Sequence, residues 1–224
     1  ITRVEEVVGQ VFHRNFSGRD MERGRNFLIV EQVVRTLKHF LKAEREIFTN
    51  ENIELLDVEL QLDHRINILL PDTGQEHEVK LVGKIDRVDR KGESLRIMDY
   101  KTGKVTASSI KVGDIQDLDG RKLTRAFQLL FYDLLYHAKG AEGAPVLYLL
   151  SLRDSEKGLV ALEMSGQRNI GEEQRRVFRG YLESLIAGLF DSSSCFGQTE
   201  DVNTCRACDF RAFCNRGSEN NGGG

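Results

Sequence analysis

The chain has 224 residues and a formal net charge of −3, and 40% of its residues are hydrophobic while 30% are charged. This balance indicates a soluble globular protein rather than a disordered chain, and the length allows one well-buried domain or a core domain with a small appendage. No apolar stretch approaches the ~20 residues that a membrane-spanning helix needs. We therefore expect a cytoplasmic protein without a membrane partner, and the first residue, Ile1, suggests that the chain is truncated from a longer polypeptide.

The first 50 residues or so have the spacing of an amphipathic helix. Apolar residues recur at intervals of three and four from Ile29 to Ile47, which gives one apolar stripe. Gly24 and Asn26 before this run, and residues 49–52 after it, supply its boundaries. We expect the stripe to pack on a sheet.

A change of period to two then predicts strands. Between residues 53 and 101, apolar and polar residues alternate, and turn residues fall at 71–74 and 90–93. The segment is therefore expected to form about three antiparallel strands.

The second half of the chain returns to helical spacing before a further strand. Residues 126–138 carry an apolar helical stripe, and the continuous apolar run at 146–152 predicts a buried strand, parallel to the earlier ones across a helical crossover. A strand at 159–164 and a helix at 172–190 should follow. The order of elements predicts a mixed α/β architecture.

Positive charge is concentrated in the middle of the chain. Between Lys80 and Arg125 there are twelve Lys or Arg residues against seven Asp or Glu, a local net charge of +5. Such a stretch suits a site that holds both a phosphate chain and a metal ion. A mixed, solvated surface is the alternative.

Two carboxylates and a lysine stand out within this stretch. Residues two apart in a strand share a face, so Asp99 and Lys101 should point the same way and Tyr100 the opposite way. Asp86 lies on the preceding strand, where the hairpin register can bring it beside Asp99. Two carboxylates can bind divalent cations that polarise a phosphodiester, and a lysine can orient or help to deprotonate the attacking water. Ordinary surface ion pairing is the alternative for all three.

The residues around these positions carry a family resemblance. Gly-Lys-Ile-Asp-Arg-Val-Asp, followed by an apolar strand into Asp-Tyr-Lys-Thr-Gly, resembles the PD-(D/E)XK nuclease superfamily, and within it the RecB-like branch. The resemblance implies a restriction-endonuclease-like α/β fold, a mixed β-sheet flanked by helices, that cleaves DNA with Mg²⁺ or Mn²⁺. It further implies that Asp86 and Asp99 bind metal, that Lys101 is catalytic, and that the Tyr100 carbonyl is a possible further ligand.

Three other positions bear on this resemblance. Gln128 and Tyr132, four apart on the predicted helix, resemble the Gln-x-x-x-Tyr element of the branch, which contributes to the active site and to DNA contacts; without the resemblance they would simply belong to a core helix. Glu59 stands where the family often has a strand glutamate near the metal, although a solvent-facing charge is equally compatible. Asp89 falls on the opposite face from Asp86, and we expect it to be a turn residue.

The family's histidine ligand has no clear counterpart. RecB-like nucleases usually carry it early in a helix, whereas His13 lacks that context and His39 lies in the apolar-striped helix, where we expect a partly buried structural imidazole. The ligand is expected upstream of Ile1.

All four cysteines lie between Cys195 and Cys214, and clustered cysteines in a chain without a secretion signal favour metal ligation over disulfides. The spacing of Cys205, Cys208 and Cys214 resembles the C-terminal iron–sulfur motif of AddB-type helicase–nuclease subunits and of nucleases associated with CRISPR adaptation. That resemblance implies a [4Fe–4S] cluster, whose fourth ligand is either upstream of Ile1 or Cys195. Zinc on the same thiolates, or unligated thiols, are the alternatives.

Taken together, the sequence predicts a nuclease core over residues 1–190 and a cysteine-containing C-terminal tail over 191–224. The expected function is hydrolysis of DNA phosphodiester bonds within a larger repair or recombination exonuclease. DNA, other domains of a longer chain and a helicase subunit are the expected partners. The rival hypotheses are a catalytically inactive module that binds DNA ends, and an interaction domain stapled by zinc or an iron–sulfur cluster.

Overall fold

The structure, a computed structural model, describes residues 1–16, 23–119, 123–154, 158–195, 197–206 and 208–216. It divides into two compact units, which are treated separately below: the first contains Ile1–Ile66 and Lys80–Gly180, and the second contains Asn67–Val79 and Tyr181–Gly224. Within the described ranges, no helix has both the length and the apolar character that a membrane crossing requires.

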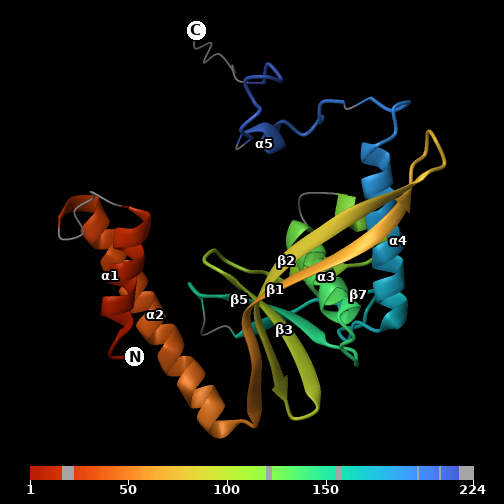
Figure 1. Ribbon diagram of the computed structural model, residues 1–224. Helices are drawn as coiled ribbons and strands as arrows, with labels where there is room; N and C mark the ends of the chain where they lie inside the picture. The colour runs from red at the N-terminus through yellow and green to blue at the C-terminus, as the bar shows by residue number, and fades with distance from the viewer. Residues whose placement is uncertain (17–22, 120–122, 155–157, 196, 207, 217–224) are drawn as a thin grey trace. The chain divides into compact units, whose positions relative to one another are not determined.

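A five-stranded mixed sheet forms the centre of the first unit (Figure 1). Its order is β1 (Ile53–Leu69), β2 (Glu76–Lys91), β3 (Ser94–Lys101), β5 (Val146–Ser151) and β6 (Leu159–Ala161). β2 and β3 are antiparallel, β3 and β5 parallel, and β5 and β6 antiparallel. This architecture confirms the predicted fold class and the parallel return of the strand at 146–152. That strand is apolar throughout because both of its faces are covered.

Helices cover the sheet on both faces. α3 (Thr124–Ala138) makes the crossover from β3 to β5, and its stripe of Ala126, Leu129, Leu130 and Leu135 is almost completely buried. It approaches β2 closely, since a Cβ built on Gly83 would lie 2.6 Å from the Leu135 Cδ1 atom. Glycine at position 83 therefore allows the helix to lie directly on the strand.

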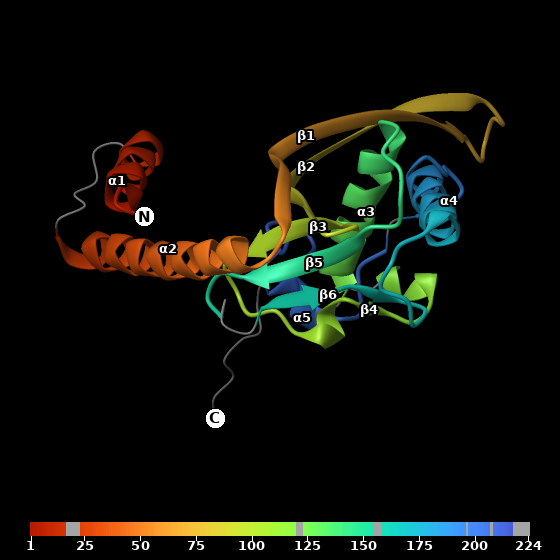
Figure 2. The same cartoon turned by 90° about the horizontal axis from the view of Figure 1, so that it is seen from below.

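The long helix α2 (Gly24–Asn50) only partly fulfils its prediction. Phe40 is buried against the sheet, with its ring 5.6 Å from that of Tyr100. Ile29 and Val33, however, remain 46% and 41% exposed. The N-terminal half of the stripe faces α1 (Val4–Asn15) instead of the sheet, because the helix extends beyond the strands (Figure 2).

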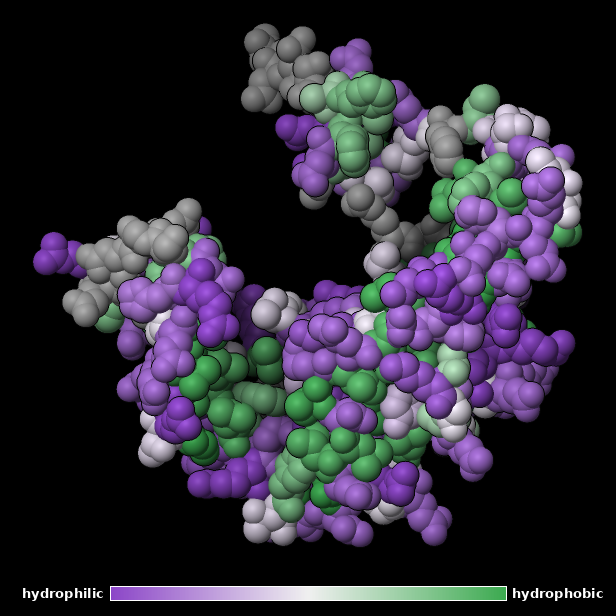
Figure 3. Space-filling model, viewed as in Figure 1, coloured by the Kyte–Doolittle hydropathy of each residue, from purple (hydrophilic) through white to green (hydrophobic). Residues whose placement is uncertain are grey.

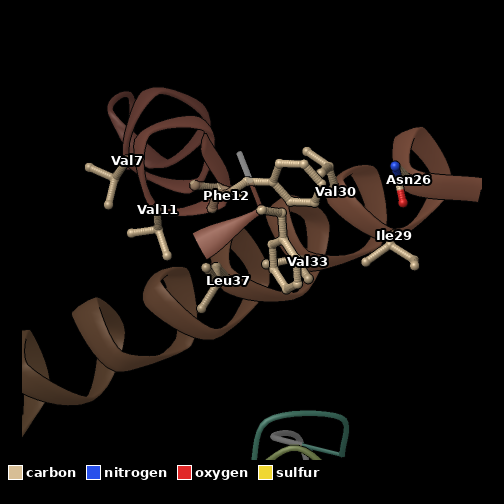
Figure 4. Close-up of a pocket in the computed structure, with 10 residues that line it drawn as sticks. Val7, Val11, Phe12, Asn26, Ile29, Val30, Val33 and Leu37 are labelled. Atoms are coloured by element: carbon tan, nitrogen blue, oxygen red, sulfur yellow. The ribbon is translucent and has the colours of Figure 1, made fainter. Parts of the chain in front are cut away.

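A groove of about 380 Å³ lies between α1 and α2. Its walls are apolar and include Val7, Val11, Val30 and Leu37 (Figure 4). The space-filling view shows the apolar surface of this helical pair (Figure 3).

Short elements complete the first unit. The predicted strand at 159–164 is two pieces, β6 and β7 (Glu163–Met164), because the chain changes sheet at the buried Leu162. β7 pairs in parallel with β4 (Lys111–Val112), which lies between the 3₁₀ helices η1 (Ala107–Ser109) and η2 (Ile115–Asp119). This two-stranded sheet was not predicted, since two residues are too few to show a period.

The second unit contains the tip of the β1–β2 hairpin, the end of α4 (Glu172–Leu189) and α5 (Val202–Cys205). The Asp72 carboxylate accepts a hydrogen bond from the Ser192 backbone N–H at 2.9 Å, and the rings of His77 and Phe190 are 4.9 Å apart. The serine run at 192–194 forms a turn on Asp191. The end of the chain at 217–224 lies outside the described residues.

A buried ionic cluster joins α3 to α4. Arg175 Nε donates to Asp133 Oδ2 at 2.9 Å, and His137 Nδ1 lies 3.0 Å from Asp133 Oδ1. Burial lowers the pKa of His137, but its contacts with Asp133 outweigh burial and hold that pKa above the ordinary value, while the Arg175 charge opposes them. The protonated imidazolium is therefore the form that the fold favours.

We expect His137 to make the protein less stable at alkaline pH. Because its pKa is higher in the folded state, its contribution is complete below about pH 6.5, the unfolded value, and is lost as the pH rises through the raised folded pKa. Urea denaturation of the wild type and His137→Gln at pH 5.5 and 8.5 checks this: the stability gap between them should be larger at pH 5.5. An equal gap at both values would contradict the assignment.

Candidate active site

The strand register places Asp86 next to the end of β3. Arg87 on β2 pairs with Met98 on β3, so Asp86 follows in line with Asp99. The Tyr100 backbone N–H donates to Asp86 Oδ2 at 2.7 Å, in place of a ladder bond. The two carboxylates predicted to converge therefore lie on adjacent strands.

One face of β3 points at α3. Lys101 Nζ donates to Gln128 Oε1 at 2.7 Å, and Gln128 Nε2 donates to the Tyr132 hydroxyl at 2.7 Å. The Tyr100 side chain between Asp99 and Lys101 contacts Phe40 of α2 instead. The alternation of faces expected from the sequence is thus observed, and Gln128 and Tyr132 do lie beside Lys101.

Asp99 is the electrostatically unusual member of the group. Its side chain is 3% exposed, and burial raises its pKa, with a smaller contribution from the Asp86 charge; Lys101 and Arg125 act in the opposite direction. Lys101 Nζ lies 2.6 Å from Asp99 Oδ2 and forms an ion pair with it, and this oxygen has no further partner within the described chain. A buried carboxylate oxygen in this position favours a nearby cation.

Tyr132 closes the polar row on α3. Burial raises the pKa of its hydroxyl, and the Asp99 and Asp86 charges raise it further, although the Gln128 hydrogen bond acts against them. The hydroxyl therefore stays protonated and can donate a hydrogen bond. Because both carboxylates raise its pKa, the Tyr132 hydroxyl shares the electrostatic environment of Asp86 and Asp99.

Arg125 is a residue of this site that the sequence reasoning missed. It lies three residues before Gln128, on the same side of α3; its Nη1 donates to the Lys104 carbonyl at 2.8 Å, and its charge lowers the pKa of Asp99. The helical spacing from Gln128 was the available signal. Arg125 was overlooked because the predicted helix began only at residue 126.

The opposite face of the sheet holds a second, largely buried charge network. Asp89 is 0% exposed and pairs with Arg87 and with Arg96, whose Nε lies 2.6 Å from Asp89 Oδ1. Arg87 also pairs with Glu44 of α2 and donates to the Tyr100 hydroxyl at 3.3 Å. Asp89 is therefore a core strand residue, and the expectation of a turn residue was wrong. The period of two correctly gave its face but not its burial.

Three other sequence candidates are exposed. Glu59 is an exposed residue of β1, with its side chain 62% exposed and paired with Lys84. His39 is exposed rather than partly buried as expected. His13 is also exposed.

The donor set at Asp86 and Asp99 fits a hard divalent cation. Mg²⁺ prefers oxygen donors and is commonly held by one or two carboxylates, together with water and substrate phosphate. Asp99 Oδ2, which faces the Lys101 ammonium, and the Asp86 carboxylate on the next strand supply two such donors. Across the described residues, no group of three or more His, Cys, Asp or Glu is placed to hold a metal.

The cysteines do not form a ligand set in this structure. Cys205, Cys208 and Cys214 are half-buried free thiols, and Cys195 is an exposed one. A [4Fe–4S] cluster or a structural zinc ion needs about four convergent ligands, and the described part of the tail brings no three together. The tail as it stands does not fit either group.

Comparison with known proteins identifies the family. A search of curated proteins finds no significant match. The solved structure of SSO0001 is 15% identical, covering 94% of this chain and 84% of that chain, with a TM-score of 0.36. The family model of the PD-(D/E)XK nuclease superfamily matches residues 2–215. Because that match spans nearly the whole sequence, the chain belongs to the PD-(D/E)XK nuclease superfamily.

Proposed function

We propose that this nuclease domain is a Mg²⁺- or Mn²⁺-dependent deoxyribonuclease of the RecB-like branch, with an active site made by Asp86, Asp99 and Lys101. The observation that carries the proposal is the buried Asp99 carboxylate, which is ion-paired with the Lys101 ammonium at 2.6 Å and has the Asp86 carboxylate on the adjacent strand. An ordinary surface ion pair would not bury its carboxylate in this way.

Each residue has a distinct role in this proposal. When bound, a divalent cation would polarise the phosphate and lower the pKa of a coordinated water. Asp86 and Asp99 supply its protein oxygen donors. Lys101 Nζ, held between Asp99 Oδ2 and Gln128 Oε1, orients the attacking water or takes part in its deprotonation. The Tyr132 hydroxyl donates a hydrogen bond at the edge of the site.

The wider setting is inferred from the same resemblance. We place the domain in a larger repair or recombination exonuclease of the AddB type, which works with a helicase subunit on DNA. The division into a core over residues 1–190 and a tail over 191–224 stays part of that proposal. No metal is assigned to the cysteines of the tail.

Degradation of labelled single- and double-stranded DNA by the chain, in Mg²⁺, Mn²⁺ or EDTA, tests the function. We expect shortened products with either metal and none in EDTA. Equal degradation of matched RNA would contradict the assignment to DNA. A folded chain that is inert with every metal would contradict the proposed nuclease activity.

Gln128→Ala should slow cleavage without unfolding the protein. The substitution removes both the acceptor for Lys101 Nζ and the donor to Tyr132. Loss of such a supporting contact typically costs ~10–100-fold. Single-turnover cleavage rates measure this effect, and Gln116→Ala, an exposed glutamine in η2, is the control. A wild-type rate for Gln128→Ala would show that Lys101 is positioned without it.

A further inference from the structure

A second cavity lies at the carboxyl ends of β3 and β5, on the side of the sheet that faces α2. Its volume is about 570 Å³, within the range of ~300–1,000 Å³ usual for small-ligand pockets. Thr102, which lines it, directly follows Lys101, the last residue of β3. Figure 2 shows β3 and β5 ending beside α2. The cavity therefore lies at the strand end that carries Lys101, on the face of the sheet opposite the Lys101 side chain.

The walls combine two kinds of surface. Val33 and Leu37 of α2, with Leu152 after β5, form an apolar wall. Gln32, Thr36 and Thr102 add amide and hydroxyl groups, and Gln32 Nε2 donates to Thr36 Oγ1 at 3.2 Å. An apolar wall with a few polar groups at its edge suits a nucleobase, which has an apolar face and a polar rim.

One residue of the cavity wall, Arg153, is positively charged, and hydrogen bonds at the end of β5 fix the backbone around it. The Leu152 N–H donates to the Lys101 carbonyl at 2.8 Å, and the Asp154 N–H donates to Ser151 Oγ at 3.1 Å. These bonds fix the backbone on both sides of Arg153. The Arg153 side chain is exposed and, among the residues that the structure describes, makes no hydrogen bond or ion pair.

We propose that this cavity is a subsite for one unpaired nucleotide of the substrate, at the strand end that carries Lys101 and across the sheet edge from the carboxylate pair, with Arg153 binding its phosphate. The inference rests on the proposed nuclease function. A guanidinium binds phosphate oxygens with two parallel N–H donors. A paired base could not enter the cavity without leaving its stack, so the subsite takes a single strand.

Because Arg153 is proposed to bind the phosphate, removing its side chain should weaken the binding of DNA. The probe is a fluorescent single-stranded oligonucleotide, bound by the chain in Ca²⁺ at several salt concentrations. We expect Arg153→Ala to weaken binding by about fivefold and to reduce the salt slope by about 0.7, the value for one phosphate contact on a single strand. Arg153→Lys should keep the slope. Arg168→Ala, an exposed arginine before α4, is the control for net charge.

A second variant tests the cavity without changing its charge. Thr36→Trp fills it from α2 and should raise KM for the oligonucleotide with little change in kcat, while thermal melting confirms the fold. The double variant Thr36→Trp/Arg153→Ala should bind no more weakly than about the worse single variant, because both act on one nucleotide.

The possible results distinguish a failure of the subsite proposal from a failure of the proposed nuclease function. Wild-type binding and salt slope in both Arg153→Ala and Thr36→Trp would overturn the subsite even if cleavage were normal. Weakened binding in both, with Arg168→Ala unaffected, would support it even if the chain proved unable to cleave.

Discussion

Asp99→Ala and Lys101→Ala should each abolish DNA cleavage while leaving the protein folded. Asp99→Ala removes the buried oxygen proposed to bind the metal, and Lys101→Ala removes the ammonium beside it. General acid–base groups typically contribute ~10²–10⁴-fold to a rate, and the loss of a metal ligand should cost at least ~10³-fold. Single-turnover cleavage in Mg²⁺, with circular dichroism to confirm folding, measures both effects.

The sheet offers a matched control for this pair. Asp63 on β1 and Lys80 on β2 form an exposed ion pair at 3.0 Å, so Asp63→Ala and Lys80→Ala remove the same chemical groups elsewhere on the sheet. Both variants should cleave at the wild-type rate. Retention of full activity in folded Asp99→Ala would refute the assignment of the metal site. Full cleavage activity in folded Lys101→Ala would show that this lysine has no catalytic role.

Asp89→Ala should destabilise the fold more than any other single change considered above. It leaves Arg87 and Arg96 buried without their shared carboxylate. Breaking a buried ion pair by removing one partner typically costs ~3–5 kcal/mol, since the remaining charge is uncompensated. Urea denaturation monitored by circular dichroism provides the measurement.

Asp63→Ala is again the control, and it should leave the unfolding midpoint nearly unchanged because that carboxylate is exposed. Replacement of Asp89 by Asn keeps the shape and should be intermediate. An Asp89→Ala protein as stable as the wild type would mean that the network contributes nothing net to folding.

The parts of the fold that follow from local periodicity were predictable. Alternation around Asp99 and Lys101 correctly gave their shared face, and four-residue spacing correctly put Gln128 and Tyr132 on the side of α3 that meets it. The hairpin between β2 and β3 has few possible registers, so the neighbouring positions of Asp86 and Asp99 could also be inferred.

What failed depended on packing between distant segments. The burial of Asp89 depends on Arg87, Arg96 and the Glu44 carboxylate of α2, and no pattern of period two reveals such partners. The stripe on α2 was assigned to the sheet although half of it faces α1, because periodicity gives the apolar side of a helix but not the neighbour that covers it.

The cysteine motif of the tail and the carboxylate motif of the candidate site differ in how well each predicts the positions of its side chains in space. Three cysteines at family-like spacing predicted a ligand set, yet Cys205, Cys208 and Cys214 are free thiols that do not converge within the described residues. Spacing along a loop constrains distance in sequence but not direction in space. The strand positions of Asp86 and Asp99, in contrast, are set by backbone pairing.

Calorimetric titration of Mn²⁺ into the wild-type chain and into Asp99→Ala is the most direct test of the metal site on which the proposed nuclease depends. We predict saturable binding to the wild type that is lost in Asp99→Ala and kept in Asp63→Ala, because the buried Asp99 oxygen beside Asp86 is the proposed metal ligand. Binding of equal affinity and stoichiometry in the wild type and Asp99→Ala would contradict the account, since the metal would then lie elsewhere.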